Sequence, residues 1–326
     1  MEHNLEITNK KRMQVFTGTA FPGLAKEIAD ELDLELGDVD IHRFSNGEIY
    51  VRYGENVRGS DVFLVQTHCE PVNANIMEQL IMIDAAKRAS AKRITAVVPY
   101  YGYARSDKKT KSREPITARL LADLLTTAGA DRVVSVDLHT GQIQGFFDNP
   151  LDHLTALPLL VGWITENCSH DDLVIASPDA GGVRLAQKFS NRLHNAPIAF
   201  LAKTRTAHNV AKTLAVVGEV EGKTVVLVDD MIDTAGTLCG AADMLLKKGA
   251  RRVIACATHP VLSGPAYQRL QESPIEKIVV TTTMPIPENS GCDKIEQISI
   301  APILALTMRA IFEDRSVSEL FNDDNA

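Results

Sequence analysis

Short apolar runs rich in Val, Ile and Leu recur along the whole chain, and amphipathic stretches separate them. These runs do not alternate with polar residues, which is typical of strands covered on both faces of a parallel sheet. Parallel strands need long crossover connections, so the amphipathic stretches predict helices between the strands. The pattern therefore predicts an α/β fold built on mostly parallel sheets. The strands are expected at 14–17, 61–66, 95–99, 133–137, 173–176, 198–202, 224–228, 253–258 and 278–282. The helices are expected at 23–32, 73–90, 116–128, 159–167, 182–193 and 237–248, with residues 303–321 helical at first and then a polar tail.

One helix-to-strand junction recurs in both halves of the chain. Residues 86–99 and 246–260 each end a helix, turn through basic residues and enter a buried strand. With 326 residues, the chain is too long for one ordinary core and suits two similar domains of roughly 150 residues each. Asn-Pro and Leu-Pro steps at 149–158 interrupt the pattern, so we predict domains at 1–155 and 156–326.

Charge and cysteine content exclude several classes of protein. The net charge of −8 argues against a nucleic-acid coat protein. The five cysteines stand far apart without a CxxC pair, which is typical of a reducing compartment. Residues 1–13 lack the apolar core of a secretion signal, and no apolar run is long enough to cross a bilayer. We expect a cytoplasmic protein that binds neither nucleic acid nor membrane.

The strongest chemical signal is the segment 224–237, TVVLVDDMIDTAGT. Asp229 and Asp230 emerge at the carboxyl end of its buried strand, the edge at which open α/β sheets bind ligands. Residues 233–237 then form a turn of small residues that opens the next helix, where backbone amides can bind a phosphate. The acids would bind ribose hydroxyls or a bridging Mg²⁺. A helix cap is the simpler alternative, but it accounts for one such residue and not for two adjacent acids, two threonines and a glycine.

The segment 218–224 resembles a P-loop at first sight. It has one residue too few between its glycines, and it precedes a strand, whereas a P-loop follows a strand and opens a helix. We therefore reject a P-loop kinase.

Residues 105–113 carry five positive charges in nine positions. Such a run is usually a solvated loop, and the lack of an interleaved aromatic residue argues against nucleic-acid binding. For a triphosphate, Arg105 can offer a bidentate fork to the phosphate oxygens. The charges are Arg105, Lys108, Lys109, Lys111 and Arg113, opposed by Asp107.

The segment 225–237 is one of several blocks in which the chain resembles the ribose-phosphate pyrophosphokinases (phosphoribosyl diphosphate synthetases). The resemblance runs from about residue 15 to residue 321. That segment alone would also fit a phosphoribosyltransferase. Four further blocks distinguish the synthetases: RFSNGE at 43–48, ARSDKKTKSREP at 104–115, DLHTGQIQGFF at 137–147 and SPDAGGV at 177–183. The resemblance implies two similar parallel-sheet domains of the type I phosphoribosyltransferase kind. It also implies transfer of the diphosphate of ATP to the anomeric hydroxyl of ribose 5-phosphate.

The resemblance implies substrate and catalytic roles residue by residue. The catalytic residues would be Lys203 and Arg205. ATP would be bound by Phe44, Asn46, Gly47, Glu48, Arg105 and Ser106, although many relatives carry glutamine at the last position. Ribose 5-phosphate would be bound by Arg205, Asp229, Asp230, Asp233, Thr234, Ala235, Gly236 and Thr237.

The resemblance also implies a metal, an assembly and an effector site. Mg²⁺ would be bound at His139 and Asp179, each of which follows a buried strand; on bare sequence a lone histidine is more often structural. Relatives are commonly homohexamers, with a phosphate or ADP effector between subunits. The matching effector residues are Arg58, Ser90, Arg113, Ser316 and Ser318, and Asn56 stands where a serine is usual.

Two rival functions are weighed against the synthetase. A phosphoribosyltransferase would share 225–237 but has no use for the block at 43–48 or for Arg105. A non-catalytic regulatory homologue would tolerate loss of the catalytic and metal-binding residues. Lys203, Arg205, His139 and Asp179 are all present, which favours an enzyme.

Overall fold

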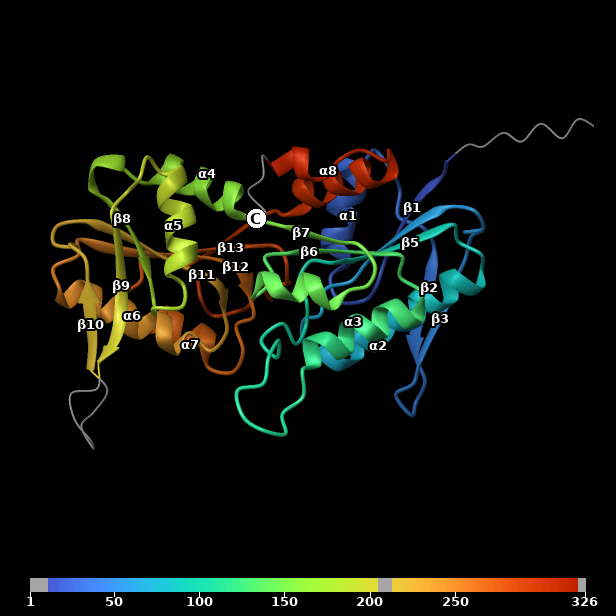
Figure 1. Ribbon diagram of the computed structural model, residues 1–326, viewed down its shortest axis with the longest axis horizontal. Coiled ribbons are helices and arrows are strands. Elements are labelled where there is room, and N and C mark those ends of the chain that lie inside the picture. The colour runs from blue at the N-terminus through green and yellow to red at the C-terminus, as the bar shows by residue number, and fades with distance from the viewer. Residues whose placement is uncertain (1–10, 205–212, 322–326) are drawn as a thin grey trace, which may run out of the picture. The chain divides into compact units, whose positions relative to one another are not determined.

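The computed structural model describes residues 11–204 and 213–321, and its chain divides into two compact units (Figure 1). Unit 1 comprises Met1–Ser135, Thr140–His153 and Ala301–Ala326, and unit 2 comprises Val136–His139 and Leu154–Ile300. The ranges 1–155 and 156–326 are therefore wrong at the C-terminus. The last helix, α8 (Ala301–Phe312), packs against α1 (Pro22–Glu31) in unit 1 instead of completing the second domain.

Unit 1 is built on a five-stranded sheet between two pairs of helices. The strand order is β1 (Met13–Thr17), β4 (Asp61–Val65), β5 (Arg93–Val98), β6 (Arg132–Val136) and β7 (Leu151–Leu154). The pairs β1–β4, β4–β5 and β5–β6 are parallel. Helices α1 and α8 pack on each other, as do α2 (Val72–Arg88) and α3 (Thr117–Ala128), and the two pairs lie on opposite sides of the sheet (Figure 1). Short 3-10 helices follow at Gly141–Phe146 and Ser318–Phe321.

An antiparallel hairpin of β2 (Val39–Arg43) and β3 (Ile49–Tyr53) forms a separate two-stranded sheet in unit 1. Strand β3 packs against α2, and the Tyr53 hydroxyl donates a hydrogen bond to Met82 O at 2.8 Å. Sequence reasoning found only a polar turn here. The two strands are partly or fully exposed along their length, so they carry none of the continuous apolar runs that revealed the buried strands.

Unit 2 contains a seven-stranded sheet that is parallel except at one edge. Its order is β10 (Thr213–Val217), β9 (Ile198–Thr204), β8 (Leu173–Ser177), β11 (Thr224–Ile232), β12 (Arg252–Pro260), β13 (Lys277–Thr281) and β14 (Ile295–Ile298). Only β10 pairs antiparallel, with β9. The helices are α4 (Leu157–Asn167), α5 (Val183–Arg192), α6 (Gly236–Lys247) and α7 (Ala266–Glu272), with a short 3-10 turn at His170–Asp172.

Both faces of this sheet are buried, which is why its strands read as unbroken apolar runs. Val225 and Leu227 of β11 pack in one cluster with α6 and α7, whereas Val226 and Val228 pack in another with α4 and α5. Successive side chains of a strand point to opposite faces, so one apolar strand supplies two cores. The predicted α/β fold with parallel sheets is confirmed. Among the described residues, no helix is long and apolar enough to cross a membrane.

The strand order of unit 2 contains a topological switch point. From β8 the chain passes first to β9 on one side, and the later strands β11, β12 and β13 then continue on the other side. The carboxyl ends of β8 and β11 therefore flank a crevice from which the connections run in opposite directions. In open parallel sheets this is where ligands bind.

Candidate functional site

Asp229 and Asp230 lie near the carboxyl end of β11, at the switch point. Both are partly buried, and the Asp230 amide donates to the Asp229 carboxylate at 2.9 Å. Burial and the neighbouring charge of Asp230 raise the pKa of Asp229 to about 8. Burial acts on Asp230 in the same direction, but the hydrogen bond and charge of His139 outweigh it and lower the pKa of that carboxyl. Burial and mutual repulsion thus favour a proton on Asp229, whereas His139 favours the ionised form of Asp230.

His139 follows β6 and reaches this pair within unit 2. Its Nδ1 lies 2.6 Å from the Oδ2 atom of Asp230. The structure thereby brings a residue expected to bind metal to a residue expected to bind the sugar, although the sequence places them 91 positions apart.

Asp179 lies in the turn between β8 and α5, on the other side of the switch point. Its Oδ1 accepts hydrogen bonds from the amides of Gly181 at 2.8 Å and Gly182 at 3.2 Å. Its charge is near enough to contribute to the raised pKa of Asp229. Several carboxylates therefore share one sheet edge, an arrangement that a bound cation would relieve.

These residues fit Mg²⁺ as a shared ion. Within the described ranges, no three His, Cys, Asp or Glu side chains form a complete protein cage for a metal. Mg²⁺ seldom needs one, because it keeps several waters and binds one or two carboxylates together with substrate phosphates. His139 and Asp179 are the residues that would hold it, with Asp229 and Asp230 close by.

Residues 233–237 form the turn that opens α6. Ala235, the residue immediately before the helix, adopts the left-handed conformation (φ 60°, ψ 0°), and its own side chain makes no capping hydrogen bond. The first amides of a helix have no acceptor within the helix itself, so the start of α6 is a place where a phosphate can bind. The carboxylate of Asp233 accepts a hydrogen bond from the Ser263 hydroxyl, which ties the turn to the segment before α7.

Arg269 of α7 supports this turn and was not found from the sequence. Its Nη1 donates to Thr234 O at 2.9 Å, and a Cβ on Gly236 would lie 3.4 Å from the same nitrogen. A positive charge therefore lies beside the N-terminal end of α6, which favours an anion there. The sequence around residue 269 contains no local pattern that predicts its contact with Thr234.

In unit 1, the ATP candidates of the block at 43–48 occupy the tip of the β2–β3 hairpin. The Phe44 amide donates to Glu48 O at 2.9 Å, and the Gly47 amide donates to Phe44 O at 2.8 Å. Gly47 has φ 91°, which a glycine adopts readily, and Asn46 accepts the Glu48 amide through Oδ1 at 3.1 Å. The Phe44 ring is 50% exposed, as a platform for a planar ligand must be.

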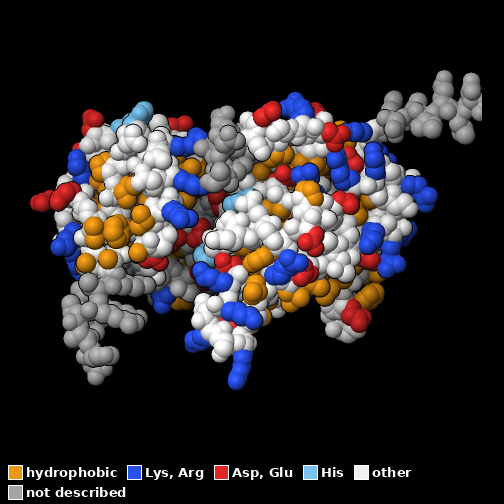
Figure 2. All heavy atoms as spheres, in the orientation of Figure 1, with side chains coloured by type: hydrophobic (Ala, Val, Ile, Leu, Met, Phe, Trp, Pro, Cys, Tyr) orange, Lys and Arg blue, Asp and Glu red, His pale blue; other side chains and the backbone are white. Residues whose placement is uncertain are grey.

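Arg105 and Ser106 lie in the long segment between β5 and α3. The Ser106 amide donates to Tyr103 O at 2.8 Å, and Ser106 O accepts the Ala118 amide at 3.2 Å, so the segment is tied to the start of α3. Lys and Arg side chains project from this segment (Figure 2). The positive charges predicted for a polyphosphate ligand are thus solvent-facing.

The remaining candidates are placed less completely. Lys203 lies in β9 opposite Leu214 of β10, and Arg205 lies outside the described residues. Among the effector candidates, Arg58 and Ser90 belong to touching loops, because the Gly59 amide donates to Ser90 O at 2.9 Å. The other three are found elsewhere in unit 1: Arg113 in the segment before α3, and Ser316 and Ser318 after α8.

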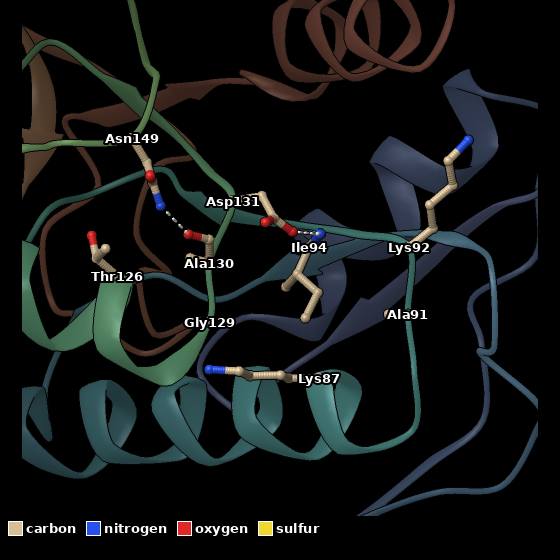
Figure 3. A pocket seen from close by; sticks show the side chains of 9 residues that line it. All are labelled: Lys87, Ala91, Lys92, Ile94, Thr126, Gly129, Ala130, Asp131 and Asn149. Atoms are coloured by element: carbon tan, nitrogen blue, oxygen red, sulfur yellow. Dashed lines mark hydrogen bonds between the residues drawn. The ribbon is translucent and has the colours of Figure 1, made fainter.

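A hollow of about 320 Å³ opens at the amino ends of β5 and β6, far along those strands from their carboxyl edge (Figure 3). Lys87 extends across Gly129 here. The hollow lies at the C-terminal ends of α2 and α3. The negative end of each helix dipole repels anions there, and the lysines at the hollow compensate this negative potential. Asp131 accepts the Ile94 amide at 2.7 Å. We assign no ligand to it.

The fold and the site define a class of protein: a parallel α/β protein with a helix N-terminus and a carboxylate cluster at a switch point. Such proteins bind phosphate-bearing ligands at that edge.

Comparison with known proteins identifies the family. A model of the N-terminal domain of ribose phosphate pyrophosphokinase matches residues 13–129, and one of the phosphoribosyl synthetase-associated domain matches residues 194–322. The ribose-phosphate pyrophosphokinase of Clostridium acetobutylicum is 53% identical over 98% of this chain and 100% of its own length. That of Mycobacterium tuberculosis is 53% identical over 97% and 98%. The crystal structure of phosphoribosylpyrophosphate synthetase from Mycobacterium smegmatis matches with a TM-score of 0.89 at 54% identity, covering 93% of this chain and 100% of that one. The chain belongs to the ribose-phosphate pyrophosphokinase family.

Proposed function

We propose that this chain transfers the diphosphate of ATP to the anomeric hydroxyl of ribose 5-phosphate, giving 5-phospho-ribose 1-diphosphate and AMP. The observation that carries the proposal is the switch point of unit 2, where the start of α6 follows the carboxylates of β11 in the chain. Family membership supports the same reaction.

The sugar phosphate would lie against unit 2. The amides at the start of α6 would bind its phosphate, with the hydroxyls of Thr234 and Thr237 as further donors. Asp229 and Asp230 would bind the ribose hydroxyls or the metal. The positive charge of Arg269 beside the turn favours the bound phosphate.

Mg²⁺, held by His139 and Asp179, would neutralise charge on the diphosphate. Lys203 would stabilise negative charge that develops at the β-phosphate as AMP leaves, and Arg205 would do so while contacting the sugar side. Phosphoryl transfer needs little covalent work from the protein, so placing cations around the transferring group is the main task. The anomeric oxygen attacks the β-phosphorus in line, and no covalent enzyme intermediate is needed.

ATP would be recognised by two segments of unit 1. The exposed Phe44 ring offers a stacking surface for adenine, and Asn46, Gly47 and Glu48 in the same turn offer groups for its edge. Arg105 would bind the polyphosphate bidentately, with Ser106 beside it.

The finer properties of the family are proposed for this chain as well. They are a cytoplasmic location, assembly as a homohexamer, and a phosphate or ADP effector site. The effector residues would be Arg58, Ser90, Arg113, Ser316 and Ser318.

Phosphorus NMR of the protein with ATP, Mg²⁺ and ribose 5-phosphate tests the reaction. We expect AMP and a new diphosphate ester only when the sugar phosphate is present. A phosphoribosyltransferase or a non-catalytic homologue would leave ATP unchanged, and that result would refute the proposal.

Lys203→Ala should lower kcat by about 10²–10³ with little change in ATP binding. Lys223→Ala is the matched control, because Lys223 precedes β11 and lies 3.7 Å from Asp172 at the surface. Unchanged turnover in the Lys203 variant would remove that residue from the mechanism.

A further inference from the structure

One buried histidine of unit 2 has no part in the proposed reaction. His259 lies in β12, opposite Met231 of β11, and is 2% exposed. Its Nδ1 lies 3.0 Å from the Thr283 hydroxyl, and its Nε2 lies 3.0 Å from the backbone oxygens of both Val136 and Asp137. Both ring nitrogens are thus engaged, and one of them reaches the segment that leads to His139.

The direction of these hydrogen bonds follows from the chemistry of the partners. A carbonyl oxygen can only accept, so the Nε2 atom of His259 carries a proton and donates to the oxygens of Val136 and Asp137. The ring is fixed from its other side by Thr283. His259 therefore holds two consecutive carbonyl groups at the end of β6.

The residue held in this way has an unusual backbone. Asp137 has φ 36°, a region that residues other than glycine seldom adopt. Its amide donates to Leu154 O at 2.8 Å, and its carboxylate accepts the Ala156 amide at 2.9 Å and the Thr258 hydroxyl at 2.6 Å. Together with the bond from His259, these contacts fix the turn by the amide, the side chain and the carbonyl.

We propose that His259 is a positioning residue for the metal-binding side chain of His139. His139 stands two residues beyond Asp137, and its Nδ1 lies 2.6 Å from Asp230. When the donor on His259 is removed, the unusual turn at Asp137 loses a constraint, and His139 is no longer held beside the carboxylates. The inference rests on the proposed function in one respect, the role of His139 as a metal ligand.

Mn²⁺ is the probe, because its binding to the full-length protein can be measured by electron paramagnetic resonance without substrates or turnover. His259→Phe keeps a flat ring of similar size and removes both polar nitrogens. We expect its Mn²⁺ affinity to fall about tenfold, as for other residues that orient a metal-binding histidine. His259→Gln restores an N–H donor and should recover most of the loss.

His68→Phe is the matched control. His68 is fully buried and hydrogen-bonded through both nitrogens, but it lies in unit 1 and contacts Gln79 and Gly102. Its replacement should leave Mn²⁺ affinity unchanged. An equal loss in this variant would show that damage to a core is sufficient, and it would overturn the proposal.

A double-mutant cycle with His139→Ala separates a positioning effect from general damage. If His259 acts through His139, the double variant binds Mn²⁺ no more weakly than His139→Ala alone. Losses that multiply, or a folded His259→Phe protein that binds as tightly as the wild type, refute the inference. If His259→Phe does not fold, long-range ¹H–¹⁵N spectra of the wild-type protein test the inference instead. We expect the proton on Nε2 of His259. An unprotonated Nε2 would refute the hydrogen bonds to Val136 and Asp137. AMP formation enters none of these measurements, so a failure of the proposed reaction is recognised separately.

Discussion

Acid should destabilise unit 1 through His68, a fully buried histidine whose charge state its hydrogen bonds dictate. The Gly102 amide donates to Nδ1 at 3.1 Å, so that nitrogen carries no proton. The Nε2–H group donates to Gln79 Oε1 at 2.8 Å, and the Gln79 amide nitrogen in turn faces Leu64 O at 3.4 Å. A second proton on Nδ1 would oppose the Gly102 N–H, and it would place a charge in a core without an acceptor.

Burial lowers the pKa of His68 from 6.5 to about 4. The unfolded chain therefore binds a proton at His68 between these two values and the folded chain does not, so the free energy of unfolding falls as pH falls through this window. The full difference of 2.5 units is worth about 3 kcal/mol, of which about 2 kcal/mol is lost between pH 7 and pH 5. Above pH 6.5 the contribution is complete.

Urea denaturation of the wild type and His68→Asn at several pH values measures this contribution. Asparagine keeps an acceptor near the Nδ1 position for Gly102 and has no group that titrates here, so its stability should change less steeply by about 2 kcal/mol between pH 7 and pH 5. An NMR titration of the His68 ring should give a midpoint near 4. Parallel losses in both proteins, or a midpoint above 6, would refute the reasoning.

Three further predictions concern unit 2 and the hairpin. Gly218→Ala should lower the free energy of unfolding in urea by about 3 kcal/mol, because a Cβ would lie 2.8 Å from Ile198 O and the backbone has φ 110°. Gly222→Ala is the control: its backbone has φ 71°, but a Cβ there would meet open space, so the loss should be about 1 kcal/mol. Equal losses in the two variants would contradict the steric argument. Phe44→Ala should raise KM for ATP about tenfold while leaving KM for ribose 5-phosphate and the Tm unchanged, since the ring is half exposed; an unchanged KM for ATP would exclude stacking. Asp229→Asn should abolish activity and raise the Tm of the metal-free protein. The raised pKa of Asp229 means that folding retains a proton which the unfolded chain releases, so wild-type stability falls as pH rises towards 8; the gain from Asn should therefore be larger at pH 8 than at pH 5, and scanning fluorimetry with EDTA tests this order.

The parts of the fold and site that could be predicted are those written into short, contiguous segments. The strand β11 and the turn before α6 lie within 224–237, so the apolar run, the acid pair and the small residues are read together. The unusual φ of Ala235 could not be read there, because alanine is an ordinary helix residue. The hairpin was missed because its exposed strands lack an apolar run. The sequence of an amphipathic helix such as α8 indicates that one face is buried, but it does not indicate which sheet covers that face. This is why the range 156–326 wrongly included α8, which belongs to unit 1.

Contacts between distant segments were beyond the sequence, and the two buried histidines are the clearest cases. His259 contacts a carbonyl 122 positions away, and His68 contacts an amide 34 positions away. Each follows a threonine at or beyond the end of a buried strand, as Thr67-His68 after β4 and Thr258-His259 in β12. That repeated dipeptide was the only local signal.

His68 and His259 each hold the backbone through one ring nitrogen, but His68 uses the nitrogen that accepts a hydrogen bond and His259 uses the one that donates. A neutral ring carries one donor and one acceptor in fixed directions on a rigid plane, so it can tie two separate segments without mobile bonds. His68 accepts an amide from Gly102, three residues before Arg105, whereas His259 donates to carbonyls just before His139. In His68 the nitrogen that binds the backbone is the unprotonated Nδ1, so acid adds its proton there. In His259 the nitrogen that binds the backbone is Nε2, which already carries a proton, so acid adds its proton at the other ring nitrogen. The backbone before the proposed ATP segment should thus be released at a higher pH than the turn before the proposed metal ligand, and hydrogen exchange at the amides of Gly102 and Asp137, followed from pH 7 to pH 4, would reveal the order. Simultaneous release of the two amides would show that the tautomers do not govern it.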